Sequence, residues 1–175
     1  MANKRISAVS ISKLWYLDPK GITEKPTIVS IKTLIESATE ITNVHQDTWS
    51  LEEAEGTETG FTDQRTGDYY RFNPTEKGEV TMNFTIGLYD METKAALMGG
   101  EATASTWARA RETPNINKAM IALTKDNVYV VFTKSKISAR QAETDGATGI
   151  AVVARAMQPD NDALSSEYWL IEEEA

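Results

Sequence analysis

The 175-residue sequence contains no cysteine and a single histidine, His45. Without cysteine the chain forms no disulfides and offers no thiolate ligand or thiol nucleophile. A Ser-His-Asp triad would have to pass through His45, and no G-x-S-x-G turn supports one. The sequence also has no phosphate-binding glycine loop of either common type. We therefore expect no enzymatic activity and no cofactor.

Carboxylates are plentiful, but their spacing does not single out a site. Asp160, Asp162 and Glu167 are spaced as in part of a calcium loop, yet Leu164 stands at a ligand position and the turn glycine is missing. A β-sandwich glycosidase could use any two carboxylates, and the abundance of Glu does not distinguish that role from solubility. We expect a solvated turn in this segment and no metal site.

Long apolar runs and excess positive charge are also lacking. Polar residues interrupt the segment after Lys4 and Arg5, so we expect neither a signal peptide nor a membrane segment, and a protein made in the cytoplasm. Acidic residues outnumber basic ones by 26 to 18, which gives a net charge of -8. Such a surface disfavours tight binding to a phosphate backbone, although DNA can pass along it without sticking.

The segment from Glu79 to Gly100 has the clearest pattern in the chain. Apolar and polar residues alternate in its first half, which predicts a strand with one buried face. The apolar set is Val80, Met82, Phe84, Ile86 and Leu88, and the polar set is Thr81, Asn83 and Thr85. Asp90 can cap a following helix that Gly99 and Gly100 end. Four residues are expected to pack this helix onto the sheet: Met91, Ala95, Leu97 and Met98.

Other strands are expected on both sides of this block. The predicted strands are Ile6–Leu17, Met120–Thr124 paired with Val128–Thr133 around a turn at 125–127, Gly149–Met157 after a turn at Asp145-Gly146, and Tyr168–Ile171 before the charged tail Glu172–Glu174. Val128–Phe132 is apolar on both faces, which predicts a central strand covered on both sides. Ser30–Thr39 has helical spacing, and Glu40–Val44 is expected to be extended.

These elements predict one mainly β domain over residues 1–175. We expect two packed, mostly antiparallel sheets, as a sandwich or barrel, with a short helix on the flank. Two connections are long: a Glu-rich, glycine-punctuated loop at about 52–68, and a second connection at about 101–118 that contains Trp107 and is too polar for core. Long loops without structure of their own are often functional, and the isolated Phe61 looks like an anchor for a partner.

A strand that ends in an acidic residue and runs into a short helix ending in Leu-x-Gly-Gly (97–100) resembles the centre of phage major tail (tail tube) proteins. The hairpin of 120–133, the KISA segment of Lys136–Ala139 and the strand of Gly149–Met157 come next in the order seen in that family, which is related to the tube proteins of contractile injection systems. The resemblance spans about Thr48 to the end. It implies a virion tail subunit, assembled in the host bacterial cytoplasm, that forms stacked hexameric rings as a conduit for DNA.

The resemblance also implies partners and contacts. The partners would be further copies of the chain and other tail proteins, with DNA passing without sequence-specific binding. A long loop in such proteins reaches a neighbouring subunit or the next ring. The corresponding candidates for inter-subunit contact are Trp49, Glu52, Glu53, Glu55, Glu58, Phe61, Arg65, Tyr69 and Tyr70. Thr81, Asn83 and Thr85 would line the lumen or face a neighbour.

Two alternatives remain open. A tail terminator or head–tail connector protein can share this fold within the virion. A carbohydrate-binding or adhesin-like β-sandwich would instead show surface Trp and Tyr residues in a row on one face, and would usually carry a secretion signal. Oligomeric state distinguishes these classes, because tube subunits form rings and tubes whereas a sugar-binding module acts as a monomer.

Overall fold

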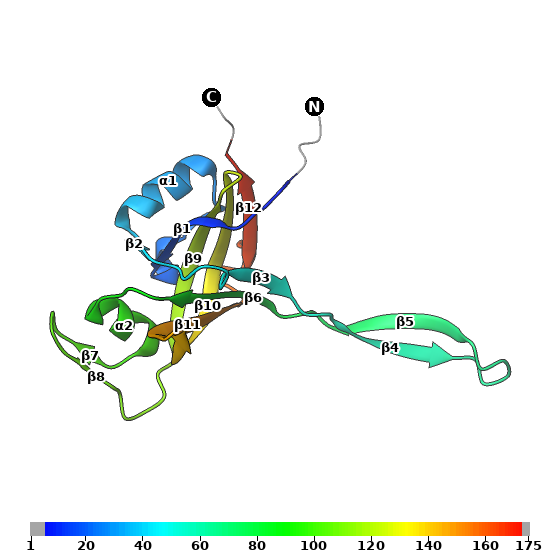
Figure 1. Ribbon diagram of the computed structural model, residues 1–175. Helices are drawn as coiled ribbons and strands as arrows, with labels where there is room; N and C mark the ends of the chain where they lie inside the picture. The colour runs from blue at the N-terminus through cyan, green and yellow to red at the C-terminus, as the bar shows by residue number, and fades with distance from the viewer. Residues whose placement is uncertain (1–5, 173–175) are drawn as a thin grey trace.

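The computed structural model describes residues 6–172 and is mainly β, with antiparallel pairing and two α-helices, which confirms the predicted fold class (Figure 1). The strands are β1 (Ile11–Leu17), β2 (Thr39–Glu40), β3 (Ser50–Glu53), β4 (Thr57–Thr62), β5 (Tyr69–Glu76), β6 (Val80–Ile86), β7 (Glu101–Ala102), β8 (Trp107–Ala108), β9 (Ile116–Thr124), β10 (Val128–Thr144), β11 (Ala147–Ala156) and β12 (Glu167–Ile171). The helices are the 3-10 turn η1 (Pro19–Gly21), α1 (Ile28–Ser37) and α2 (Met91–Met98). Neither α-helix in this part of the chain is long and apolar enough to cross a membrane.

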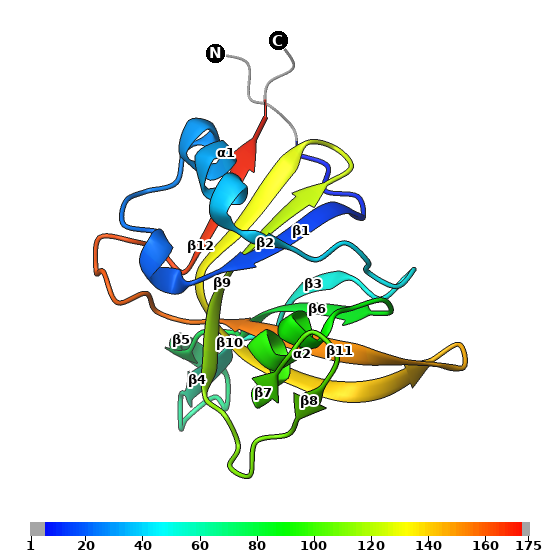
Figure 2. The ribbon, with the colours of Figure 1, turned by 90° about the vertical axis from the view of Figure 1, so that its left-hand side faces the viewer.

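Eight strands form one bent sheet in the order β2-β1-β9-β10-β11-β6-β3, with β12 also paired to β10. The 17-residue β10 belongs to two halves: its first part pairs with β9 and β12, and its last part pairs with β11. Its register with β9 shifts between Phe132 and Ser135, where a bulge bends the strand (Figure 2). We call the two parts the β1 half (β1, β2, β9, β12) and the β6 half (β3, β6, β11). Over the described residues the sheet stays open and is not a closed barrel.

The main core lies between the two halves of the bent sheet, as in a sandwich. It joins Leu14, Met120 and Phe132 of one half to Phe84 and Val152 of the other. Burying such side chains is the main favourable contribution to folding, at about 1.5–3 kcal/mol for each large apolar residue.

A second core cluster covers the opposite face of the β1 half, where Ile31 of α1 packs with Trp15 and Ile121. Val128–Phe132 is buried throughout, with Val130 and Phe132 in the main core and Tyr129 and Val131 in the second cluster. The prediction of a central strand covered on both faces is confirmed.

Several helices and strands begin or end at residues other than those predicted. β1 begins at Ile11 rather than Ile6, because Ser10 has a positive φ of 54° that breaks the extended run. The helix predicted for Ser30–Thr39 covers Ile28–Ser37, since the Thr27 and Ser30 side chains form a capping box that starts it earlier. Only the first residue of Glu40–Val44 lies in a strand. The predicted tail residues Glu173 and Glu174 lie outside the described residues.

The strand–helix block of 79–100 forms as predicted, with one error. Met82, Phe84 and Ile86 are buried, and the Asp90 carboxylate accepts a 2.6 Å hydrogen bond from the Thr93 N–H at the start of α2. Leu88 was expected on the buried face, but it is 72% exposed. The strand ends at Ile86, because the Asn43 side chain accepts from the N–H groups of residues 87 and 88 and turns the chain.

An ion pair holds α1 against the end of the sheet. Lys32 on α1 pairs with Glu172, and the Glu172 N–H donates to the Asn127 carbonyl at 2.9 Å. The hydrogen bond with Lys32 lowers the pKa of Glu172, and the same bond with Glu172 raises the pKa of Lys32. Burial, followed by the nearby Glu172 charge, raises the pKa of Tyr129.

These pKa shifts predict the pH range over which the ion pair stabilises the fold. A lowered carboxyl pKa contributes stability above the ordinary value of 4.5, and that stability is lost as pH falls through the folded-state pKa. A raised lysine pKa contributes below the ordinary value of 10.5 and is lost as pH rises through the folded-state pKa. Glu172→Gln should therefore lower the melting temperature slightly at neutral pH and have no effect at pH well below 4.5. Thermal melts of both proteins across pH test this, and a difference independent of pH would contradict it.

Candidate functional site

Residues 55–78 form a two-stranded arm that projects from the β6 half (Figure 1). This arm corrects the predicted loop at 52–68: Glu52 and Glu53 belong to β3 of the main sheet, and most of residues 57–76 are paired as the strands β4 and β5. The base is closed by a 2.9 Å hydrogen bond from the Ala54 N–H to the Glu79 carbonyl. Gly78 is required there, because a Cβ on it would lie 1.6 Å from the Ala54 carbonyl oxygen.

The outer part of the arm exposes aromatic side chains on both of its faces. Tyr69 and Phe72 stack at 5.0 Å over Gly60, whose hydrogen leaves room for the Tyr69 ring. A bulge at Tyr70 turns that ring toward Phe61 on the other face, with 6.5 Å between centroids. The four rings are 40–69% exposed. An isolated two-stranded hairpin is marginal in water, so an arm carrying this much exposed apolar surface is suited to being covered by a partner.

The inner part of the arm is acidic. Glu55, Glu58 and Glu76 surround a hollow of about 330 Å³ at its base, next to Glu52 and Glu53 of β3. Within residues 6–172, no basic side chain lies within 4.0 Å of any of these five carboxylates. Repulsion among them is therefore relieved only by solvent or by a cationic partner.

The other residues predicted to contact a neighbour lie in different settings. Arg65 is in the turn at the tip of the arm, where it pairs at 3.5 Å with Asp63. Trp49 lies outside the arm: its ring packs against the main core and its buried indole N–H has no acceptor among the described residues. Most of the Trp49 side chain is thus covered by the domain itself.

The face of the β6 half that points away from the main core is polar. Directly paired residues of antiparallel strands share a face, so Thr81 lies in a row with Arg155 and Lys136, and Asn83 in a row with Val153 and Ser138. Thr85 continues this surface beside Ala151 and Arg140, although the Thr85 side chain itself is buried. Neither α-helix covers this surface, because α1 packs on the β1 half and α2 on the main core. We call it the bare face.

The bare face is bounded by two strand edges without a partner. Among the described strands, β3 pairs on one side only, with β6. Beyond Ile137, the last residue of β10 opposite β9, the segment 138–144 pairs on one side only, with β11. Unpaired edges of this kind are templates for pairing with another chain.

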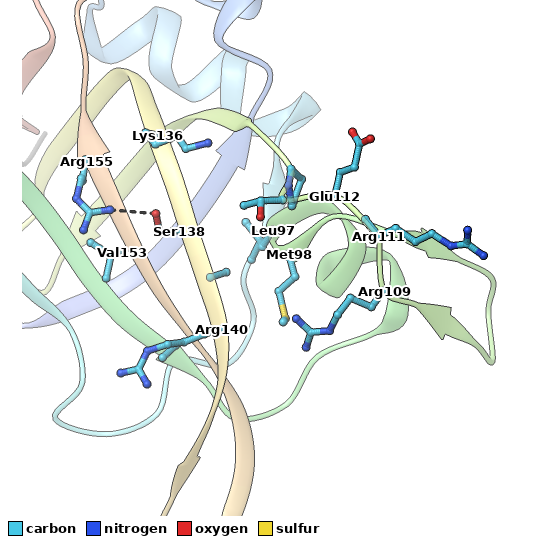
Figure 3. Close-up of a pocket in the computed structure, with 15 residues that line it drawn as sticks. Leu97, Met98, Arg109, Arg111, Glu112, Lys136, Ser138, Arg140, Val153 and Arg155 are labelled. Carbon is cyan, nitrogen blue, oxygen red and sulfur yellow. Dashed lines mark hydrogen bonds between the residues drawn. The ribbon is translucent and has the colours of Figure 1, made fainter.

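A groove lies along the free edge of β10 and brings together cations from three segments distant in sequence (Figure 3). Its volume is about 580 Å³ and its five basic side chains are Arg109, Arg111, Lys136, Arg140 and Arg155. Leu97, Met98 and Val153 supply apolar lining, and Glu112 is the one acidic side chain among the described lining residues. We call this site the cationic groove.

Helix α2 packs beside this groove partly as predicted. Leu97 and Met98 are buried in the main core, whereas Met91 and Ala95 are only partly covered. No sequence pattern predicts Lys94 in the interior, yet it is 8% exposed and its ammonium lies 4.3 Å from the Trp107 ring centroid. Cation–π attraction compensates part of the cost of covering the charge.

The second connection, 101–118, is predicted to be too polar for core, and none of its residues is buried, although Trp107 is partly covered. The Trp107 ring packs against the main core and its indole N–H donates to the Gly99 carbonyl at 2.9 Å. Trp107 therefore fixes this connection, which carries Arg109 and Arg111, next to the end of α2.

No family model and no curated protein matches this chain.

His45 contacts the turn between β10 and β11. Its Nε2 lies 2.8 Å from an Asp145 carboxylate oxygen in the β10–β11 turn, and the Thr48 hydroxyl donates to the His45 carbonyl rather than to the ring. Within residues 6–172, no three His, Asp or Glu side chains are grouped so as to hold a metal ion. Among the described residues, the candidate functional surfaces are the arm, the two free edges with the bare face, and the cationic groove.

Proposed function

We propose that this protein is a tail tube subunit of a virion, which assembles into hexameric rings that stack into a conduit for DNA. The observation that carries the proposal is the projecting arm, whose aromatic side chains are uncovered on both faces. A feature of this kind is unfavourable on a monomer and favourable once a second copy covers it. The resemblance of residues 48–175 to major tail proteins supplies the kind of assembly and the ring number.

The strand edges support ring formation. The β6 half presents four strands, β3, β6, β11 and the end of β10, whose directions alternate. In a ring, rotation keeps the direction of each strand, so the free edge of β3 in one copy meets the free edge of β10 in the next as an antiparallel pair. The contact is heterologous, and rotation closes it into a ring without leaving either of these two edges exposed.

The bare face supports the role of a conduit. When the sheets of several copies join edge to edge, one face of the joined sheet turns inward, and the bare face is the one with Thr81, Asn83 and Thr85. Its side chains are polar, which suits a water-filled passage, and the three cations on it, Lys136, Arg140 and Arg155, have to be neutralised by acidic groups for DNA to pass without binding. DNA is then a passing cargo rather than a ligand, and other tail proteins cap the two ends.

The carbohydrate-binding alternative finds less support in the aromatic arrangement. A sugar platform needs its rings in one row, whereas the rings of the arm are divided between the two faces of a narrow ribbon. A tail terminator or connector would share the fold and the edges, but would form a single ring that does not stack.

Self-assembly tests the proposal directly. Purified protein should sediment as rings and longer particles as its concentration rises, and negative-stain microscopy should show stacked rings with a central passage. Single rings at all concentrations would indicate a terminator or connector. A protein that stays monomeric over a wide concentration range, or that binds oligosaccharides as a monomer, would overturn the proposal.

A further inference from the structure

The cationic groove is unusual in a chain with a net charge of -8, because it collects five of the 18 basic side chains. Figure 3 shows Arg109 and Arg111 on one side of β10, and Arg140 and Arg155 on the other. Bringing so many like charges together costs free energy, and the fold accepts this cost with no matching acidic group inside the groove except Glu112.

Little of this charge is neutralised within the described residues. Arg155 pairs at 2.5 Å with Glu79, but Lys136 donates to the neutral side chain of Asn115 and Arg109 to that of Gln141. Arg111 and Arg140 have no carboxylate within 4.0 Å among residues 6–172. Most of the positive charge is therefore available to an anionic group from outside.

The shape of the groove favours an extended polypeptide as its occupant. The free edge of β10 at 138–144 lies along it and can add a strand by main-chain hydrogen bonds. Val153 is partly exposed between the charges and provides an apolar contact, and Leu97 and Met98 form the buried floor behind it. A nucleic acid would need a wider basic surface, whereas here the acidic Glu112 stands in the groove itself.

An acidic segment with a free strand edge exists in this same chain. β3 and the base of the arm carry Glu52, Glu53, Glu55, Glu58 and Glu76, none of which has a basic partner within residues 6–172. The arm projects away from the side where α2, β7 and β8 lie (Figure 1). Its acidic base therefore meets the groove of a second copy more readily than its own.

We propose that the cationic groove is the receptor for the acidic base of the arm of a neighbouring copy, with Arg109, Arg111 and Arg140 paired to the glutamates between 52 and 58. This inference rests on the proposed assembly. It identifies the two charged surfaces that meet in that assembly and so set the orientation of each copy relative to the next. Copies join head to tail because each has one acidic and one basic partner surface, and two like surfaces repel.

Charge reversal on one side should prevent assembly. The groove variant Arg109→Glu with Arg140→Glu, and the arm variant Glu55→Arg with Glu58→Arg, each place like charges against one another. Each should raise the concentration needed for assembly at least about tenfold, because like charges at an interface cost several kcal/mol. All four side chains are exposed, so circular dichroism and melting temperature should match the parent. The control Lys25→Glu with Lys125→Glu changes the net charge by the same amount as the groove variant, at exposed sites outside the groove, and should assemble normally.

Restoration distinguishes pairing from a general charge effect. A chain that carries all four substitutions should assemble again, and so should an equal mixture of the groove variant and the arm variant, in which each acidic surface finds a basic one. Sedimentation and microscopy measure both.

Each remaining outcome contradicts either this inference or the proposed function. A groove variant that assembles like the parent overturns this inference and leaves the proposed function intact, whereas a parent that never assembles overturns the function. Loss of assembly without restoration, together with parent binding to a DNA oligonucleotide that the groove variant has lost, would identify a nucleic-acid site and overturn the inference.

Discussion

Replacing residues 55–78 with an Asn-Gly turn should give a folded, soluble protein that no longer forms tubes. The cut is defined by the structure, because the Ala54 N–H and the Glu79 carbonyl are already 2.9 Å apart and a two-residue turn can join them. A cut at 52–67 would instead remove half of β3 and leave β5 without its partner.

The arm contributes to assembly rather than to the core. None of its side chains belongs to either core cluster, and closing a much shorter loop lowers the entropic cost of closure by about 2 kcal/mol. The melting temperature should therefore be unchanged or slightly higher, while sedimentation shows only small species. A deletion variant that makes long tubes as readily as the parent would show that the arm is ordinary solvated surface.

A single substitution in the arm should act in the same direction with a smaller effect. Phe61→Ser removes an apolar ring, which is worth about 1.5–3 kcal/mol if assembly buries it, and so raises the concentration needed for tubes. Val29→Ser is the matched control, since Val29 is 76% exposed on α1, far from the arm in the chain. Equal effects of the two substitutions would argue against a specific role for Phe61.

The parts of this fold that were predictable from the sequence are those with a buried face. The alternation of β6 and the two-sided apolar run at the start of β10 each reflect local packing against a core, so their periods identify them. The arm has no such signal. Its strands are exposed on both faces, so no alternation develops, and its Glu and Gly residues are typical of a loop.

Features that depend on contacts between distant segments could not be predicted. Leu88 continues the alternation of β6, and only the Asn43 side chain, 45 residues away, ends the strand before it. The cationic groove combines residues near 110, 138 and 155, and no spacing in the sequence connects them. Lys94 is buried because Trp107 covers it, and a helical lysine otherwise indicates an exposed face.

The largest expected effect on stability comes from Leu97→Asp in α2. Leu97 is 1% exposed and packs in the main core between the halves of the sheet. Truncating a buried leucine costs about 2–5 kcal/mol, and a buried carboxylate without a partner adds to this cost. Since domains of this size have a total stability of about 5–15 kcal/mol, the variant should be unfolded or insoluble.

Two further variants keep this prediction testable when Leu97→Asp yields no soluble protein. Leu97→Ala should fold with a melting temperature lower by about 5–15 °C, the shift that a loss of a few kcal/mol produces in a domain of this size. Leu88→Asp makes the same chemical change at a leucine that is 72% exposed, so it should melt close to the parent. A Leu97→Ala variant that melts with the parent would show that α2 does not contribute to the core, and that the strand–helix block is not the packed centre of this domain.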